Sequence, residues 1–273
     1  MTRAAEKLGA RYACLAWLAF AALVARGAGA QDFAGALPPW PPQAPSDLLE
    51  RGLPPRGRSS LVEIDGVRWF SLADLASRGC AVGSAFGPLR AACGLSQTGS
   101  EELGWTALGV ALGAAYPMAG AAARMVARRD CRASLDPAVA PREGYEVGFG
   151  AWAEATRGLH VWTSVPQLWR DGAAPPLARG LELGVALAAQ DLSAWLARTS
   201  AAGPPGGVAE HALGLGLTLG PLGVWLAARD RPLRGTLGLS AAFKAVFVAA
   251  GVDGHPVLGE TVRLSVGCLR SER

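Results

Sequence analysis

The chain has 273 residues, of which 51% are hydrophobic and 18% are charged, and 36 are glycine. This composition is apolar for a soluble protein, yet it is not the composition of a chain made wholly of membrane helices. The formal net charge of +4 comes without a basic run interleaved with aromatic residues, which disfavours nucleic-acid binding.

Residues 1–30 have the form of a secretory signal peptide. Three basic residues precede an apolar stretch at 12–24, which is too short to span a bilayer comfortably. Ala28-Gly29-Ala30 then matches a small-x-small cleavage site. We therefore predict export and a mature chain that begins at Gln31, with an uncleaved membrane anchor as the alternative.

Residues 31–60 differ from the rest of the chain because proline is dense and no apolar period is present. Such a segment favours an extended conformation. We expect a Pro-rich periplasmic leader that acts as a spacer. The Pro-Pro-Trp-Pro-Pro run at 38–42 leaves a polyproline ligand as an alternative.

Residues 61–268 alternate between apolar and small side chains, most clearly at 210–229. Leu213, Leu215, Leu217 and Leu219 share one parity, and Gly214 and Gly216 lie on the other. The alternation restarts after Gly220-Pro221, which is a turn signal. A period of two is that of a strand, and glycine is unfavourable inside an ordinary soluble strand. The pattern fits a barrel wall with leucine facing lipid and small residues facing the lumen.

About thirteen segments show this pattern, most of them near the length that a tilted membrane crossing needs. They are 80–86, 89–96, 106–116, 118–128, 145–156, 159–169, 177–190, 192–198, 212–219, 222–229, 236–244, 245–252 and 260–266. Since bacterial barrels have even strand numbers, we predict an all-β, antiparallel transmembrane β-barrel of about 12 strands, with 10 or 14 as alternatives. The barrel would span 61–268, and 269–273 would form a C-terminal tail.

A small inner-membrane helical protein is the main alternative. Residues 103–123 contain no charge and are long enough for a membrane helix, and residues 212–228 are nearly so. Three observations count against it. Apolar positions alternate, Pro117 and Pro221 fall where hairpins would turn, and Glu146, Glu182 and Lys244 lie on the small-residue parity.

The C-terminal sequence LGLSAAFKAVFVAAGVDGHPVLGETVRLSVG, at 237–267, carries a family resemblance. A Gly-rich strand, a second strand ending near Asp253, a His-Pro turn at 254–259 and a final strand at 261–266 follow one another. This arrangement resembles the last three strands of PorV/PorQ-like and FadL-like bacterial outer-membrane barrels, and it extends loosely over 65–268. The resemblance implies an outer-membrane barrel that serves transport or a secretion assembly.

Charged residues on the inner parity are the candidate functional residues. The candidate lumen-facing side chains are Arg124, Arg128, Glu146, Glu154, Glu182, Lys244 and Arg263. They would form either an ion-pair network that fills a narrow barrel or the lining of a conduction path. Trp152 and Trp225 fall on the same parity and are expected to fill the lumen.

No catalytic, cofactor or metal site is predicted. His160, His211 and His255 have no cysteine or carboxylate at metal-ligand spacing, and there is neither a Gly-x-Ser-x-Gly elbow nor a nucleotide-binding loop. Four cysteines follow the signal peptide: Cys80, Cys93, Cys131 and Cys268. Cys80 and Cys93 could form a disulfide. Alternatively, the cysteines serve as small apolar residues of the wall.

These observations favour a non-enzymatic outer-membrane barrel of a Gram-negative bacterium. It would be either a channel for small or hydrophobic molecules or a scaffold for a surface or secretion assembly. A lipid-modifying outer-membrane hydrolase is a further alternative. The expected partners are outer-membrane lipid and a component of a secretion or surface assembly, and no nucleic acid or cofactor is expected.

Overall fold

The computed structural model describes residues 38, 40–56, 60–69, 76–99, 104–130, 143–172, 179–201, 209–231 and 233–269. The expected signal peptide at 1–30, and residues 270–273 of the expected tail, lie outside the described residues. None of the described helices combines the length and hydropathy of a membrane span.

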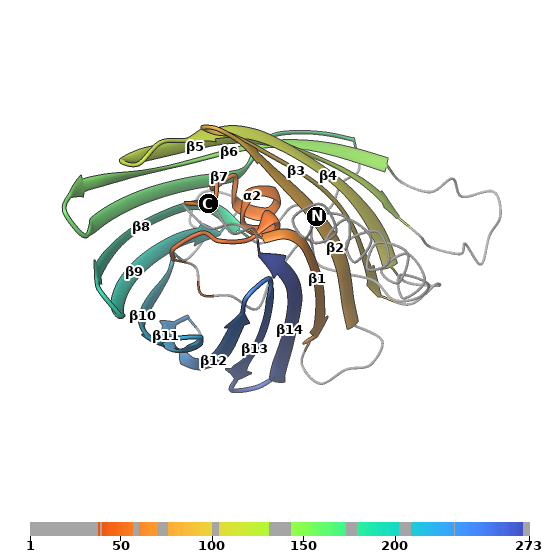
Figure 1. Cartoon of the computed structure of the whole chain (residues 1–273). Coiled ribbons are helices and arrows are strands. Elements are labelled where there is room, and N and C mark those ends of the chain that lie inside the picture. The colour runs from red at the N-terminus through yellow and green to blue at the C-terminus, as the bar shows by residue number, and fades with distance from the viewer. Residues whose placement is uncertain are drawn as a thin grey trace, which may run out of the picture.

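The described residues form a closed antiparallel barrel in which each strand pairs with its neighbours in sequence and β1 pairs with β14 (Figure 1). The strands are β1 (Ser60–Arg68), β2 (Ala76–Phe86), β3 (Leu89–Gly99), β4 (Gly104–Ala115), β5 (Ala119–Asp130), β6 (Glu143–Thr156), β7 (Leu159–Gly172), β8 (Arg179–Ala189), β9 (Leu192–Ala201), β10 (Glu210–Leu219), β11 (Leu222–Asp230), β12 (Leu233–Phe243), β13 (Val246–His255) and β14 (Gly259–Leu269).

The predicted all-β, antiparallel closed barrel is confirmed, with fourteen strands rather than twelve. The segment that suited a membrane helix instead forms β4 and β5 around the turn at 116–118. The helical alternative is therefore wrong. Alternation with a period of two, and not hydropathy alone, distinguishes the two structures.

Apolar side chains cover the outside of the barrel. Leu215 is 53% exposed and Leu264 is 53% exposed, whereas inward-facing Ser265 is fully buried. In the last strand, Leu264 faces outward, whereas Thr261 and Ser265 face inward and are buried. An apolar outer face suits hydrocarbon, and the closed ring leaves no unpaired edge strand.

The two ends of the barrel differ in their connections. Two-residue turns at 87–88, 157–158, 190–191, 220–221 and 244–245, and a three-residue turn at 116–118, lie at one end, which we term the turn end. β1 begins and β14 finishes there, because the first and last strands run in opposite directions. At the opposite, loop end, the β13–β14 turn occupies 256–258, slightly shorter than the expected turn at 254–259.

Residues 40–56, which we term the plug, lie inside the ring (Figure 1). Their helix α2 (Pro45–Arg51) packs against β1–β7. Leu48, Leu49 and Leu53 are almost fully buried. The expectation of an extended spacer over 31–60 is thus wrong for residues 40–56, because these apolar side chains are buried by the barrel wall.

Local chemistry explains why a short helix forms within the Pro-rich segment. Proline at the first helical position needs no amide partner, and the Asp47 carboxylate accepts hydrogen bonds from the main-chain amides of Gln43 and Ala44. Gly52 then ends the helix in the left-handed conformation, with φ of +65°.

Pro166 lies within β7 and does not end the strand. β7 continues to Gly172, with a register shift against β6 between Val147 and Phe149. Its pairing with β8 runs from Leu159–Leu187 to Ser164–Glu182. Proline is tolerated in a sheet at such an irregularity because it lacks an amide donor.

Candidate functional site

The candidate functional site is the contact between the plug and the inner wall of the barrel. Two plug arginines pair with wall carboxylates: Arg51 Nη2 lies 2.5 Å from Glu182 Oε1 on β8, and Arg56 Nη2 lies 2.5 Å from Glu154 Oε2 on β6. The first pair is buried, whereas the Arg56 side chain is 32% exposed. Opposite charges on two separate elements therefore join the plug to the wall.

Wall side chains also hydrogen-bond to the main chain of the plug. Arg124 Nη1 donates to Leu49 O at 2.7 Å, Ser164 Oγ donates to Arg51 O at 2.6 Å, and Trp152 Nε1 donates to Pro54 O at 2.9 Å. A segment rich in proline leaves carbonyls without partners of their own, and a buried carbonyl without a partner is costly. The barrel wall supplies these partners.

Aromatic rings form the second part of the contact. Trp40 of the plug stacks on Trp162 of β7, with centroids 5.1 Å apart and planes at 12°. It meets Trp152 edge-on at 6.2 Å. Offset-stacked and edge-on geometries are the favourable ones for aromatic pairs.

The wall tryptophans explain several of the strand glycines. Trp162, Trp195 and Trp225 lie across Gly184, Gly214 and Gly238 of the following strands, and a Cβ at these glycines would come within 2.0–2.2 Å of an indole atom. Glycine is thus needed where a neighbouring indole lies flat on the wall. Trp152 and Trp225, predicted to face inward, are both buried there.

An ion-pair network lies behind the plug on β5 and β6. Arg124 and Arg128 both contact the Glu146 carboxylate, and all three side chains are buried. Arg124 also donates to Pro166 O, and Gln167 Nε2 donates to Glu146 Oε2 at 3.1 Å. Arg124 thus provides the hydrogen-bond donor for the inward-facing carbonyl of Pro166.

The structure brings most of the predicted lumen-facing residues to this contact. Arg124, Arg128, Glu146, Glu154 and Glu182 lie inside the barrel around the plug. Arg263 also faces inward and lies over the ring of Trp69, 5.4 Å from its centroid.

Lys244 was expected in the lumen, and this expectation is wrong. It occupies the turn between β12 and β13 with φ of +50°, and its side chain is exposed. The strand ends one residue earlier, at Phe243, so the alternation no longer applies at Lys244.

Sequence reasoning did not identify the acidic residues of β1 or the arginines of the plug. Glu63 and Asp65 are buried and face inward from β1. Val62 and Ile64 alternate with them, which is the signal that the sequence contained. Arg51 and Arg56 lie in the segment that was interpreted as a spacer.

Burial affects the one titratable plug side chain at the start of α2. Desolvation raises the pKa of Asp47 above its usual value, opposed by the nearby Arg51 guanidinium and by the amides of Gln43 and Ala44. Arg51 Nη1 lies 3.9 Å from Asp47 Oδ1. The Arg51 guanidinium is thus shared between the plug helix and Glu182 of the wall.

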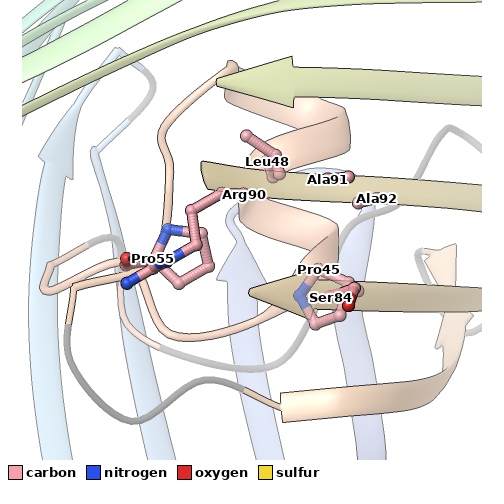
Figure 2. A pocket seen from close by; sticks show the side chains of 8 residues that line it. Pro45, Leu48, Pro55, Ser84, Arg90, Ala91 and Ala92 are labelled. Atoms are coloured by element: carbon pink, nitrogen blue, oxygen red, sulfur yellow. Dashed lines mark hydrogen bonds between the residues drawn. The ribbon is translucent and has the colours of Figure 1, made fainter. Parts of the chain in front are cut away.

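A small cavity remains between α2 and the β2–β3 hairpin (Figure 2). Its volume is about 10 Å³, and Pro45, Leu48, Pro55 and Arg90 are among the residues around it. This is room for about one water molecule. Arg90 extends across it and donates to Pro55 O at 3.4 Å. The plug therefore fits closely against this part of the wall.

A second charged group lies on β10–β13 toward the loop end. Glu210 accepts from Arg229 Nη1 at 2.8 Å and from Arg234 Nη2 at 2.5 Å, and Arg234 Nε lies 3.9 Å from Asp253 Oδ1. The side chains of Glu210, Arg229 and Arg234 are partly exposed. The lumen wall is thus charged well beyond the part that contacts the plug.

The histidines make local contacts of different kinds. His160 lies 3.0 Å from Arg56 Nη1, His211 Nδ1 lies 2.8 Å from Asp230 Oδ2 on the exposed rim, and His255 Nδ1 accepts from the Val257 and Leu258 amides. In the described part of the chain, no three His, Cys, Asp or Glu side chains could together hold a metal ion.

Three of the cysteines can be placed, and Cys131 lies outside the described residues. Cys80, Cys93 and Cys268 are free thiols. Cys80 and Cys93 share the outward parity of their strands, because Cys80 is opposite Leu95 and Cys93 is opposite Val82. This placement agrees with their interpretation as small wall residues.

No protein family matches the chain, and no curated protein matches it. Among solved structures, it is similar to mutant forms of the Rh. blastica porin, at 9% identity with TM-scores of 0.41 and 0.42, covering 78% of this chain and 99% of those chains. A KdgM porin is similar at 10% identity and a TM-score of 0.38, with coverage of 78% and 99%. These values assign no family to the chain.

Proposed function

We propose that the protein is a non-enzymatic outer-membrane channel for small water-soluble molecules, closed at rest by its own plug. The observation that carries this proposal is the chemistry of the wall behind the plug. Arg124, Arg128, Glu146 and Glu182 face the interior, whereas the outer face is apolar. A charged wall is suited to contact with water once the plug moves away.

Barrel size supports the same proposal. Barrels of about 8 strands are filled by their own side chains, whereas those of about 16–18 strands leave an aqueous channel. With fourteen strands the interior is too wide for wall side chains alone, and Leu48, Leu49 and Trp40 of the plug pack against the wall inside it. Displacing one short segment would therefore open a path.

The plug is held by apolar packing of Leu48, Leu49 and Trp40 against the wall and also by polar groups that water could satisfy. Its ion pairs to Glu182 and Glu154 and its hydrogen bonds to Arg124 and Ser164 can be exchanged for contacts with water. These polar contacts are the part of the plug–wall contact that favours a plug able to leave, because a buried polar group needs a partner that water can replace.

Location and processing form part of the proposal. A closed barrel with an apolar outer face belongs in the outer membrane, where lipid would surround it. Residues 1–30 would direct export and be removed after Ala30. N-terminal sequencing of the membrane-bound protein tests this, and a chain that still begins at Met1 or Thr2 would contradict it. The likeness to PorV/PorQ and FadL barrels stays a prediction.

Conductance of the full chain in planar bilayers tests the channel. The double variant E154Q/E182Q removes both wall carboxylates that pair with the plug arginines, so buried Arg51 keeps only Asp47, at 3.9 Å, as an opposite charge. Breaking one buried pair typically costs about 3–5 kcal/mol, so the open fraction should rise at least about tenfold. E143Q is the matched control, because Glu143 belongs to the exposed rim pair with Arg129.

The outcomes separate the channel from a scaffold. Higher conductance in E154Q/E182Q than in wild type and E143Q supports the channel. Absence of conductance in all three folded proteins would favour a scaffold for a surface or secretion assembly. Anomalous migration on gels before heating establishes that each variant has folded. If E154Q/E182Q does not fold, R56A replaces it, since Arg56 is partly exposed.

A further inference from the structure

One histidine of the wall contacts both ends of the plug. Trp40 is the first residue of the plug and Arg56 is its last, and the two ends are joined by a hydrogen bond from the Arg56 amide to Pro42 O at 3.2 Å. His160, the second residue of β7, has its ring centroid 5.1 Å from that of Trp40. Both ring nitrogens of His160 also lie 3.0 Å from Arg56 Nη1. A change at this one side chain therefore acts on both ends of the plug.

The charges around His160 are balanced while its imidazole is neutral. Glu154 of β6 is directly opposite His160, and its carboxylate lies 2.5 Å from Arg56 Nη2. The Gly158 amide donates to the same carboxylate at 3.0 Å. On β8, the residue opposite His160 is Ala186, which carries no charge. Arg56 and Glu154 thus neutralise each other, and a proton on His160, which is only 3% exposed, would add a buried positive charge.

Protonation of His160 would weaken its contact with the plug in two ways. A neutral imidazole has one nitrogen that can accept a hydrogen bond from Arg56, whereas an imidazolium has none. The new charge would also repel the guanidinium group 3.0 Å away and compete with it for Glu154. Attraction between an imidazolium and the Trp40 ring acts in the opposite direction. It is the weaker effect, because repulsion between charges in contact at a buried site exceeds a cation–π attraction.

We propose that His160 is a pH-sensitive switch for the plug: the neutral side chain holds both ends of the plug, and the protonated side chain releases them. Imidazole is the side chain that ordinarily changes charge between pH 5 and 8. Once the plug has left, His160 is hydrated and no longer faces Arg56, so the released state takes up the proton more readily. Acid therefore favours release.

The switch is placed to respond to the aqueous phase at the turn end. His160 is two residues past the turn at 157–158, and the Arg56 side chain is 32% exposed. Short turns of outer-membrane barrels lie on the periplasmic side. A fall in pH on that side would release the plug. The switch regulates the channel of the proposed function and rests on it, but release of the plug can be measured separately from conduction.

Labelling of a buried plug thiol tests the switch in the full chain. In a parent protein whose native cysteines are replaced by alanine, S46C introduces a thiol at a position that is 3% exposed. Its rate of labelling by a methanethiosulfonate is measured in lipid vesicles at about pH 7.5 and about pH 5.5, with and without H160Q. Glutamine can accept from Arg56 but cannot be protonated in this range. The ratio of the two rates at each pH removes the intrinsic pH dependence of the thiol.

The expected result follows from the uptake of one proton. A single proton changes the equilibrium by at most about tenfold per pH unit, so the ratio of the parent rate to the H160Q rate should rise by about 10- to 100-fold over this range. H211Q is the matched control, because His211 contacts Asp230 on the exposed rim, and it should respond to acid as the parent does. An equal response to acid with and without H160Q, or no response in the parent, would overturn the proposal.

A second variant and a second measurement complete the test. If H160Q does not fold, R56Q replaces it. Loss of the guanidinium group should raise labelling at neutral pH but abolish the further increase in acid, because the repulsion is gone. Conductance is recorded on the same proteins. Labelling that rises in acid without any conductance would support the switch while refuting the channel.

Discussion

Arg51 Nη2 lies 2.5 Å from Glu182 Oε1, although the two residues are 131 positions apart in the chain. The same carboxylate oxygen accepts a hydrogen bond from Trp162 Nε1 at 2.8 Å. One wall residue therefore joins the plug, β7 and β8, and the plug and barrel are connected through a shared buried charge.

Removing Arg51 should destabilise the protein more than removing both members of this pair. R51M leaves Glu182 buried without its cation, and such a loss typically costs about 3–5 kcal/mol. In R51M/E182Q the wall side chain is neutral and only Asp47 still lacks its arginine partner, so the free energy of unfolding should recover in part. Urea unfolding of the three proteins measures this. A double variant less stable than R51M would contradict the pairing.

A side chain added at a glycine that an indole ring covers should destabilise the barrel. A Cβ at Gly238 would lie 2.0 Å from the Trp225 ring, so G238A should destabilise the barrel by about 1–3 kcal/mol through overpacking. Gly235, on the same strand, has no neighbouring atom within 4 Å of such a Cβ, and G235A is the matched control. Unfolding curves that coincide for the two variants would refute the role of the indole.

Mutations on β10 can test which of its side chains point toward lipid and which point into the lumen. L215R places a charge on the lipid side and should cost about 2–4 kcal/mol near the bilayer midplane. T218R is the control, because Thr218 has inward parity near the turn end and is exposed to solvent. Unfolding in lipid vesicles provides the comparison. If both variants were tolerated equally, the outer face would not contact hydrocarbon.

The closing strand should be indispensable. β14 pairs with β13 on one side and with β1 on the other, so deletion of 260–273 would leave two strand edges unpaired in hydrocarbon. We expect no membrane-inserted barrel from this deletion, measured by heat-dependent migration on gels. Deletion of 270–273 removes no paired residue of β14 and should be mild. A folded product lacking 260–273 would disprove closure by β14.

Alternation allowed the barrel to be predicted from the sequence. Side chains in a strand alternate between two faces, so the leucines of β10 and the glycines between them already separate lipid from lumen. The same argument places Arg124, Arg128, Glu146, Glu154 and Glu182 on the inner parity. It does not apply at Lys244, because a turn interrupts the period there.

The plug and its contacts were decided by the tertiary structure alone. A Pro-rich segment has no period of its own, and seven helical residues are too few to be stable without packing. Leu48 and Leu49 become buried only because fourteen strands close around them, and Arg51 meets Glu182 only because β8 lies on that closed wall. Strand alternation is a local property of the chain, whereas enclosure of one segment by another depends on the closure of the whole ring.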